Sequence, residues 1–124
     1  MAALHERQLV VIGGDAAGLS AASKARRLDP EARIIVLEQR DYVSYSLCGT
    51  PYYIGGVVSK LEQLVVHTPD FFREKRGLDV RTGHRVLALS PWRRTLQVRD
   101  LATGVEYEET YDRLLIATGA RPKA

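Results

Sequence analysis

The sequence predicts an α/β fold in which a parallel sheet with helices is followed by a small antiparallel β-meander. Residues 9–12 form an apolar run typical of a strand buried on both faces, and a glycine-rich turn follows it. The alanine-rich segment 16–28 is typical of a helix, and a second apolar run, 33–37, is typical of the next strand. A strand, a connecting helix and a second strand in this order form adjacent parallel strands.

The turn after the first strand carries a glycine fingerprint. It reads Gly13-Gly14-Asp15-Ala16-Ala17-Gly18, and an acid, Glu38, follows Gly18 by 20 positions at the end of the second strand. In a Rossmann-like dinucleotide site the first glycine makes the turn, the helix N-terminus faces the pyrophosphate, and the acid accepts hydrogen bonds from ribose hydroxyls. The spacing therefore favours a dinucleotide site over the alternative, a βαβ unit that binds nothing.

Asp15 stands where the fingerprint usually has its middle glycine. A side chain at this position would obstruct the approach of the backbone to a phosphate, and a carboxylate would repel the phosphate. The alternative is that Asp15 caps the following helix and points away from the ligand.

The predicted helix over 16–28 has two faces that differ in character. The small and apolar residues at helical spacing, which we expect to face the sheet, are Gly18, Ala22, Ala25 and Leu28. Ser20, Lys24 and Arg27 follow an i, i+4, i+7 pattern along another side. One hydroxyl and two cations in a row suit an anion site, and a solvated helix face is the alternative.

Residues 42–56 hold the only cysteine, Cys48, and four of the six tyrosines. Gly49 leaves room for a substrate to approach the sulfur. If a helix begins near Cys48, its dipole favours the thiolate, which is the reactive form. A buried and unreactive cysteine is the alternative, and the residues alone leave both open.

Turn and cap residues divide the rest of the chain. A capping-box order predicts a short helix starting at Ser59, and Thr68 followed by Pro69 predicts another helix that ends at Gly77. The predicted strands are a third parallel strand at 78–81, antiparallel strands at 85–89, 95–99 and 105–108, and a last buried strand within 111–116 that ends in a glycine turn.

The composition is that of a globular protein, with 124 residues of which 45% are hydrophobic and 27% are charged. The net charge of +3 comes from cations spread along the chain, which argues against a nucleic-acid-binding tail. No apolar run has the length of a membrane span or of a signal-peptide core. One cysteine allows no internal disulfide, so we expect a cytoplasmic protein, and the isolated histidines predict no metal site.

Three motifs together resemble the N-terminal FAD-binding region of the flavin-dependent pyridine nucleotide-disulfide oxidoreductases. They are the fingerprint 13–18 with Glu38, the segment 44–49 around the cysteine, and the turn 117–119. The principal disulfide reductases carry two cysteines, whereas this chain has one. It therefore resembles the single-cysteine branch, which holds coenzyme A-disulfide reductases, NADH oxidases and NADH peroxidases. The segment 51–55 is most similar to that of the coenzyme A-disulfide reductases.

The resemblance implies roles for individual residues. Cys48 would be the redox-active thiol, reduced by NAD(P)H through FAD, and coenzyme A disulfide or a related CoA mixed disulfide or persulfide would be the substrate. The implied FAD contacts are Gly13, Gly14, Ala16, Ala17, Gly18, Glu38, Arg40, Val86, Ala117, Thr118 and Gly119. The implied substrate contacts, whose cations suit the phosphates of coenzyme A, are Ser20, Lys24, Arg27, Ser44 and Arg76. Leu47 departs from an asparagine that is common in this branch.

Members of this family continue with an NAD(P)H domain, the remainder of the FAD domain and a dimerisation domain. We therefore expect residues 1–124 to be the N-terminal part of an FAD-binding domain from a homodimeric enzyme, inactive by itself. Two alternatives are an NADH oxidase or peroxidase of the same branch, and a stand-alone nucleotide-binding module without catalysis. We expect neither a nucleic acid nor a membrane as a partner.

Overall fold

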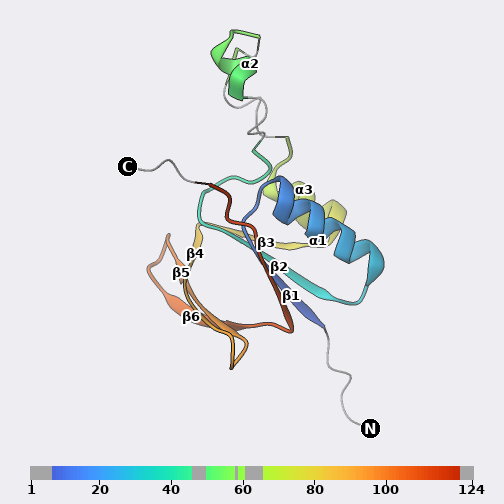
Figure 1. The fold of residues 1–124 in the computed structure, drawn as a ribbon, viewed down its shortest axis with the longest axis vertical. Helices are drawn as coiled ribbons and strands as arrows, with labels where there is room; N and C mark the ends of the chain where they lie inside the picture. Colours follow the sequence, from blue (N-terminus) through green and yellow to red (C-terminus); the bar gives the residue numbers. More distant parts are fainter. Residues whose placement is uncertain (1–6, 46–49, 58, 61–65, 121–124) are drawn as a thin grey trace.

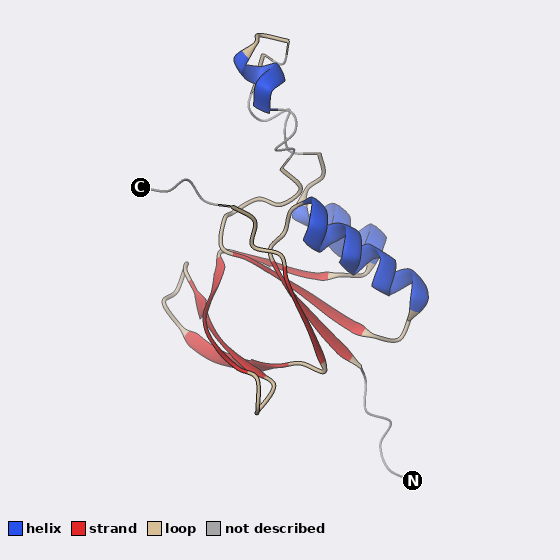
Figure 2. Cartoon of the chain, viewed as in Figure 1, coloured by secondary structure: helices blue, strands red, loops and turns tan. Residues whose placement is uncertain are grey.

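Figure 1 shows the computed structural model of the chain, which describes residues 7–45, 50–57, 59–60 and 66–120. It contains a four-stranded parallel sheet and a three-stranded antiparallel sheet. Two helices cover the face of the parallel sheet that is turned away from the antiparallel sheet (Figure 2). The predicted α/β class and the predicted meander are both confirmed.

The parallel sheet has the strand order β3-β2-β1-β7. The strands are β1 (Gln8–Ile12), β2 (Arg33–Glu38), β3 (Asp79–Thr82) and β7 (Arg113–Ile116). In the centre of the sheet Val10 pairs with Ile35 of β2 and with Leu114 of β7. All neighbouring strands are parallel, so their carboxyl ends meet at one edge of the sheet.

Two helices, α1 (Ala16–Leu28) and α3 (Pro69–Arg76), pack on one face of this sheet. α3 begins where the sequence predicts it, because Thr68 Oγ1 accepts a hydrogen bond from the Phe71 N–H at 3.2 Å. The buried core between the helices and the sheet consists of Val11, Leu19, Ala22, Ile34, Val36, Val43, Phe72, Leu78 and Val80.

The antiparallel sheet packs on the opposite face of the parallel sheet. Its strands are β4 (His84–Ser90), β5 (Thr95–Asp100) and β6 (Glu106–Thr110). The core between the two sheets consists of Val10, Ile35, Leu37, Leu96 and Val98. Alternate residues of β1 and β2 enter different cores, because successive side chains of a strand point to opposite faces.

One residue, Gly83, connects β3 to β4, so the chain passes from one sheet into the other without a loop. The Gly83 N–H donates to the Arg40 carbonyl oxygen at 2.9 Å, and the Gly83 carbonyl oxygen accepts from the Leu101 N–H at 2.7 Å. The connection is therefore held from both sides.

Two expectations about burial are wrong. Leu28 does not face the sheet, because its side chain is 73% exposed and Leu19 is buried instead. With 3.6 residues per turn, Leu28 lies about 120° around the helix from the buried Ala22. The last strand is not the buried strand that the sequence predicts: β7 is an edge strand, Leu114 and Leu115 are only partly buried, and Ile116 is 56% exposed.

The short helix α2 (Thr50–Ile54) lies away from both sheets (Figure 1). Cys48 and Leu47 lie outside the described residues. Ser59 is not helical, and residues 61–65 of the helix predicted to start there lie outside the described residues. Within the part of the chain that the structure describes, no helix is long and apolar enough to cross a membrane.

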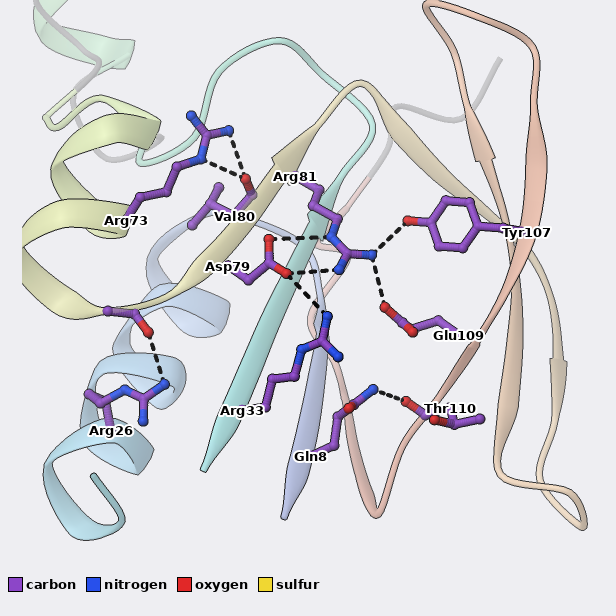
Figure 3. A network of polar contacts seen from close by, with 11 residues as sticks. Gln8, Arg26, Arg33, Arg73, Asp79, Val80, Arg81, Tyr107, Glu109 and Thr110 are labelled. Carbon is purple, nitrogen blue, oxygen red and sulfur yellow. Dashed lines mark hydrogen bonds and ion pairs between the residues drawn. The ribbon is translucent and has the colours of Figure 1, made fainter. Parts of the chain in front are cut away.

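Arg81 on β3 joins the two sheets (Figure 3). It donates to both carboxylate oxygens of Asp79, at 3.3 and 2.8 Å, and reaches Glu109 Oε1 at 2.8 Å and Tyr107 Oη at 3.0 Å on β6. Burial lowers the pKa of Arg81, but the hydrogen bonds to Asp79 and then to Tyr107 outweigh it, so the pKa is raised. Arg81 is therefore a permanently charged clamp between β3 and β6.

Two other arginines bind backbone carbonyls beside the helices (Figure 3). Arg26 of α1 donates to the Gly77 oxygen at 2.8 Å, at the end of α3, and to the Pro30 oxygen at 2.9 Å. Arg73 of α3 donates to the Val80 oxygen of β3 at 2.9 and 2.7 Å. These bonds fix the two helices to each other and to the sheet.

Candidate functional site

A groove of about 480 Å³ lies at the carboxyl ends of β1 and β2, next to the start of β4. Open α/β sheets bind their ligands at this edge. The groove is lined by Ile12, Gly13, Leu37, Glu38, Gln39, His84, Arg85, Val86, Thr118 and Gly119. Its volume falls in the range of roughly 300–1,000 Å³ that is usual for small-molecule sites.

The glycine turn at the groove is packed too closely for larger residues. Gly13 has a φ of +114°, and a Cβ atom there would overlap the carbonyl oxygen of Ala117. A Cβ atom on Gly18 would likewise overlap the carbonyl oxygen of Gly13. The Ala117 N–H donates to the Ile12 oxygen at 2.8 Å. The first and the last of the three motifs therefore adjoin each other, although they lie at opposite ends of the chain.

Glu38 is buried at the end of β2 and already holds the turn. Its Oε1 accepts a hydrogen bond from the Gly14 N–H at 2.9 Å, and its Oε2 accepts one from the Arg40 N–H at 2.9 Å. The Arg40 guanidinium donates to the two oxygens at 2.9 and 3.0 Å. Burial raises the pKa of Glu38, but the bonds from Arg40 and Gly14 outweigh it and hold the pKa below its ordinary value of 4.5. Glu38 is thus ionised at neutral pH.

Asp15 shares the Arg40 guanidinium with Glu38. Arg40 Nη2 donates to Asp15 Oδ2 at 2.7 Å, and the Tyr45 N–H donates to Asp15 Oδ1 at 2.9 Å. The expectation that Asp15 caps α1 is therefore wrong: it occupies the N-cap position, but its side chain accepts no hydrogen bond from a helix amide. Both oxygens have other donors, and the side chain does not line the groove.

The groove residues fit a dinucleotide. Because the Asp15 side chain does not cap α1, it leaves the first amides of this helix for a pyrophosphate. The ionised Glu38 lines the groove, and Gly14 and Arg40 hold its carboxylate in place. A ribose hydroxyl would share one of its oxygens with these donors. Arg40 itself does not line the groove; its guanidinium lies 4.6 Å from the Tyr42 ring centroid.

A second pocket, of about 420 Å³, lies between α1, α3 and the Ser44–Tyr45 segment. Its lining residues are Ala16, Leu19, Ser20, Ser23, Arg27, Ser44, Tyr45, Val66, Phe72 and Arg76. Two guanidinium groups near several hydroxyls suit a phosphorylated ligand, because charge-assisted hydrogen bonds to phosphate are strong.

The structure brings most of the predicted substrate contacts together in the second pocket. Ser20, Arg27, Ser44 and Arg76 all line it, whereas Lys24 is exposed and does not. Sequence reasoning missed Ser23 and Tyr45, which line the same pocket. The only sequence signal for Ser23 was its hydroxyl group on α1, the helix that also carries Ser20 and Arg27.

Some of the predicted cofactor contacts line the groove, whereas Gly14, Ala17, Gly18, Arg40 and Ala117 do not. Its lining includes Gly13, Glu38, Val86, Thr118 and Gly119, together with Gln39, His84 and Arg85, which sequence reasoning missed. Ala16 lines the second pocket instead. No sequence signal could have found His84, since its place depends on how β4 folds over β2. Among the described residues, no three His, Cys, Asp or Glu side chains are grouped so that they could hold a metal ion.

Replacing Arg40 with methionine should destabilise the protein by about 2 kcal/mol at pH 7, because the buried Glu38 carboxylate loses charged donors. The folded-state pKa of Glu38 is depressed, so the stabilisation is present above pH 4.5 and is lost as the pH falls through the folded-state pKa. The variant and the wild type should therefore converge in stability once the pH falls below the folded-state pKa of Glu38, where the carboxyl group is protonated. Urea unfolding of both proteins at pH 7 and at acid pH measures this difference in the free energy of unfolding.

The control for Arg40 is Arg93→Met, which removes an exposed ion pair with Glu108 at 3.5 Å. It should change the free energy of unfolding by less than about 0.5 kcal/mol. A loss in Arg40→Met that is the same at acid and neutral pH would contradict the role given to Glu38.

The glycine turn, the buried acid and the adjoining groove have the layout of a dinucleotide-binding α/β protein. Residues 7–124 match the pyridine nucleotide-disulphide oxidoreductase family, and the chain belongs to this family. It is 38% identical over 113 residues to the coenzyme A disulfide reductase of Staphylococcus aureus (strain JH9), which covers 91% of this chain and 26% of that protein.

Two solved structures share the fold. The NAD-dependent persulfide reductase from A. fulgidus has a TM-score of 0.87 and 43% identity, over 94% of this chain and 22% of that one. The water-forming NADH oxidase from Lactobacillus brevis has a TM-score of 0.89 and 31% identity, over 96% of this chain and 26% of that one. The chain thus spans about a quarter of the length of these relatives.

Proposed function

We propose that this chain is the FAD-binding and thiol-bearing part of an NAD(P)H-dependent disulfide oxidoreductase of the single-cysteine branch. In this proposal residues 1–124 are the N-terminal part of an FAD-binding domain within a longer, homodimeric, cytoplasmic protein. The substrate is coenzyme A disulfide, or a related CoA mixed disulfide or persulfide, and Cys48 is the thiol that reacts with it.

The observation that carries the proposal is that two pockets flank one glycine turn. Gly13 lines the groove, and Ala16, three residues later, lines the second pocket. Ser44 and Tyr45 form part of the wall of the second pocket and come shortly before Cys48 in the chain. A cofactor groove and an anion pocket on either side of one turn, with Cys48 three residues after Tyr45 in the sequence, suit the reduction of a charged disulfide.

Each pocket contributes its own chemistry in this proposal. At the groove, the amides at the start of α1 bind the pyrophosphate of FAD and Glu38 binds its ribose. Bound FAD supplies the relay of electrons between NAD(P)H and sulfur. In the second pocket, Arg27 and Arg76 bind phosphates of coenzyme A, while Ser20 and Ser44 add hydroxyl donors. Overall, the hydride of NAD(P)H, which carries two electrons and one proton equivalent, and one proton from solvent convert the disulfide into two thiols and leave NAD(P)+.

A second candidate function, NADH oxidase, is favoured by the likeness to the oxidase from L. brevis. Its substrate, oxygen, carries no phosphate. The two cations of the second pocket therefore have a use in a coenzyme A enzyme that they lack in an oxidase.

The test removes those cations in the complete protein that contains this chain. Arg27→Ala and Arg76→Ala should each raise the KM for coenzyme A disulfide about tenfold, the value of one charge-assisted hydrogen bond. The KM for NADH should stay unchanged, because the groove is intact. Lys75→Ala removes an exposed neighbour of Arg76 that does not line the pocket, and it serves as the control.

Lys24→Ala tests whether a cation must line the second pocket, or only belong to the cationic row of the sequence, to affect substrate binding. Because Lys24 does not line the pocket, its effect on the KM for coenzyme A disulfide should be smaller than that of Arg27→Ala. Equal changes in the KM for both substrates, or no change in either, would refute the assignment of the second pocket.

A further inference from the structure

We propose that Asp15 is a positioning residue that fixes the wall of the second pocket. The proposal rests on the function proposed above, since it concerns the pocket assigned there to the substrate. Asp15 replaces the glycine usual at this point of the fingerprint, yet it lines neither the groove nor the second pocket. Its side chain is 25% exposed and binds only donors from the protein in the described contacts.

Two donors from the segment that follows β2 converge on the Asp15 carboxylate. Oδ1 accepts the backbone N–H of Tyr45 at 2.9 Å, and Oδ2 accepts Nη2 of Arg40 at 2.7 Å. A carboxylate has an acceptor oxygen for each of them, whereas an asparagine has one for both and an alanine has none. The residue type is therefore matched to its two donors.

The bond to Tyr45 matters because the residue before it is strained. Ser44 has a φ of +62°, a left-handed conformation that is unfavourable for a residue with a Cβ atom. The Ser44 N–H donates to the Gly14 oxygen at 2.7 Å, and the Ser44 oxygen accepts from the Val66 N–H at 3.0 Å. Together with the bond from Tyr45 to Asp15, these contacts hold Ser44 and Tyr45 where they line the second pocket.

The other carboxylate oxygen connects this wall to the groove. Arg40 Nη2 donates both to Asp15 Oδ2 and to Glu38 Oε1, the latter at 2.9 Å. Asp15 and Glu38 are therefore held by one guanidinium, so the pocket wall and the buried acid of the groove share a single support. A glycine at position 15 would provide neither bond.

The experiment measures two quantities in the complete flavin-loaded protein, for Asp15→Ala and Asp15→Asn. Hydrogen exchange of the Tyr45 amide should become about tenfold faster in Asp15→Ala. The KM for coenzyme A disulfide should rise about tenfold in the same variant, with the KM for NADH unchanged. Asp15→Asn should lie between the wild type and Asp15→Ala in both quantities, since its oxygen serves one donor. Asp41→Asn, at an exposed acid of the same segment, is the control.

The outcomes separate the two proposals. Unchanged exchange at Tyr45 in Asp15→Ala would overturn the positioning role, and faster exchange with an unchanged KM for coenzyme A disulfide would overturn its effect on the substrate. If Asp15→Asn equals the wild type in both quantities, one acceptor oxygen is sufficient, and the match of the carboxylate to two donors is overturned. A wild-type protein that does not reduce coenzyme A disulfide refutes the proposed function, while the exchange of Tyr45 still decides whether Asp15 holds the segment.

Discussion

Replacing Gly13 with alanine should destabilise the protein by about 4 kcal/mol or prevent folding, because two costs add. The φ of +114° is unfavourable for any residue with a Cβ atom, and the new methyl group would overlap the Ala117 carbonyl oxygen. Neither segment can move freely, since Gly13 is bonded to the Leu37 oxygen at 2.9 Å and Ala117 to the Ile12 oxygen at 2.8 Å. The free energy of unfolding in urea measures the loss.

Gly104→Ala is the matched control for this substitution. Gly104 also has a positive φ, +77°, but a Cβ atom there would meet no other atom within 4 Å. It should therefore show only the conformational cost, about 1 kcal/mol. Equal losses at the two positions would contradict the explanation by close packing.

Arg81→Met should cost about 3 kcal/mol, because it leaves two carboxylates without their shared counter-charge. Glu109 is the more buried of the two, with 14% of its side chain exposed, and it accepts the Arg81 bond at 2.8 Å. Asp79 keeps a second, longer ion pair with Arg33 at 3.9 Å, so most of the loss falls on Glu109. Urea unfolding at pH 7 provides the measurement.

The control for Arg81 removes an exposed ion pair within the antiparallel sheet. Arg99 contacts Glu106 at 2.8 Å, but both side chains are largely exposed to solvent, which screens their attraction. Arg99→Met should leave the free energy of unfolding nearly unchanged. A loss in Arg81→Met no larger than that in Arg99→Met would show that the clamp between the sheets does not stabilise the fold.

The elements were predictable because their signals are local. The helix over 16–28 follows a glycine turn and ends before Pro30, and Thr68 with Gly77 delimits the other long helix. The dinucleotide layout was predictable for the same reason, since the turn and Glu38 belong to one continuous strand–helix–strand unit. Leu28 was misjudged because a count of apolar residues does not fix the centre of the buried face.

The contacts between distant segments were not predictable. Arg81 could be recognised as a clamp only after β3 and β6 were brought side by side, and Arg40 only after Asp15 and Glu38 faced it. The cationic row on α1 shows the same limit. The spacing groups Lys24 with Ser20 and Arg27, but only Ser20 and Arg27 line the second pocket.

The one-residue passage at Gly83 joins the two walls of the groove. One wall ends in Leu37 and Glu38 and the other begins at His84, while the Gly83 N–H donates to the carbonyl oxygen of Arg40, two residues beyond Glu38. Moving the walls apart would break this bond, so we expect the width of the groove to be set when the chain folds. A ligand that enters such a groove would meet a site that is already shaped, and little of its binding free energy would be spent on ordering the protein.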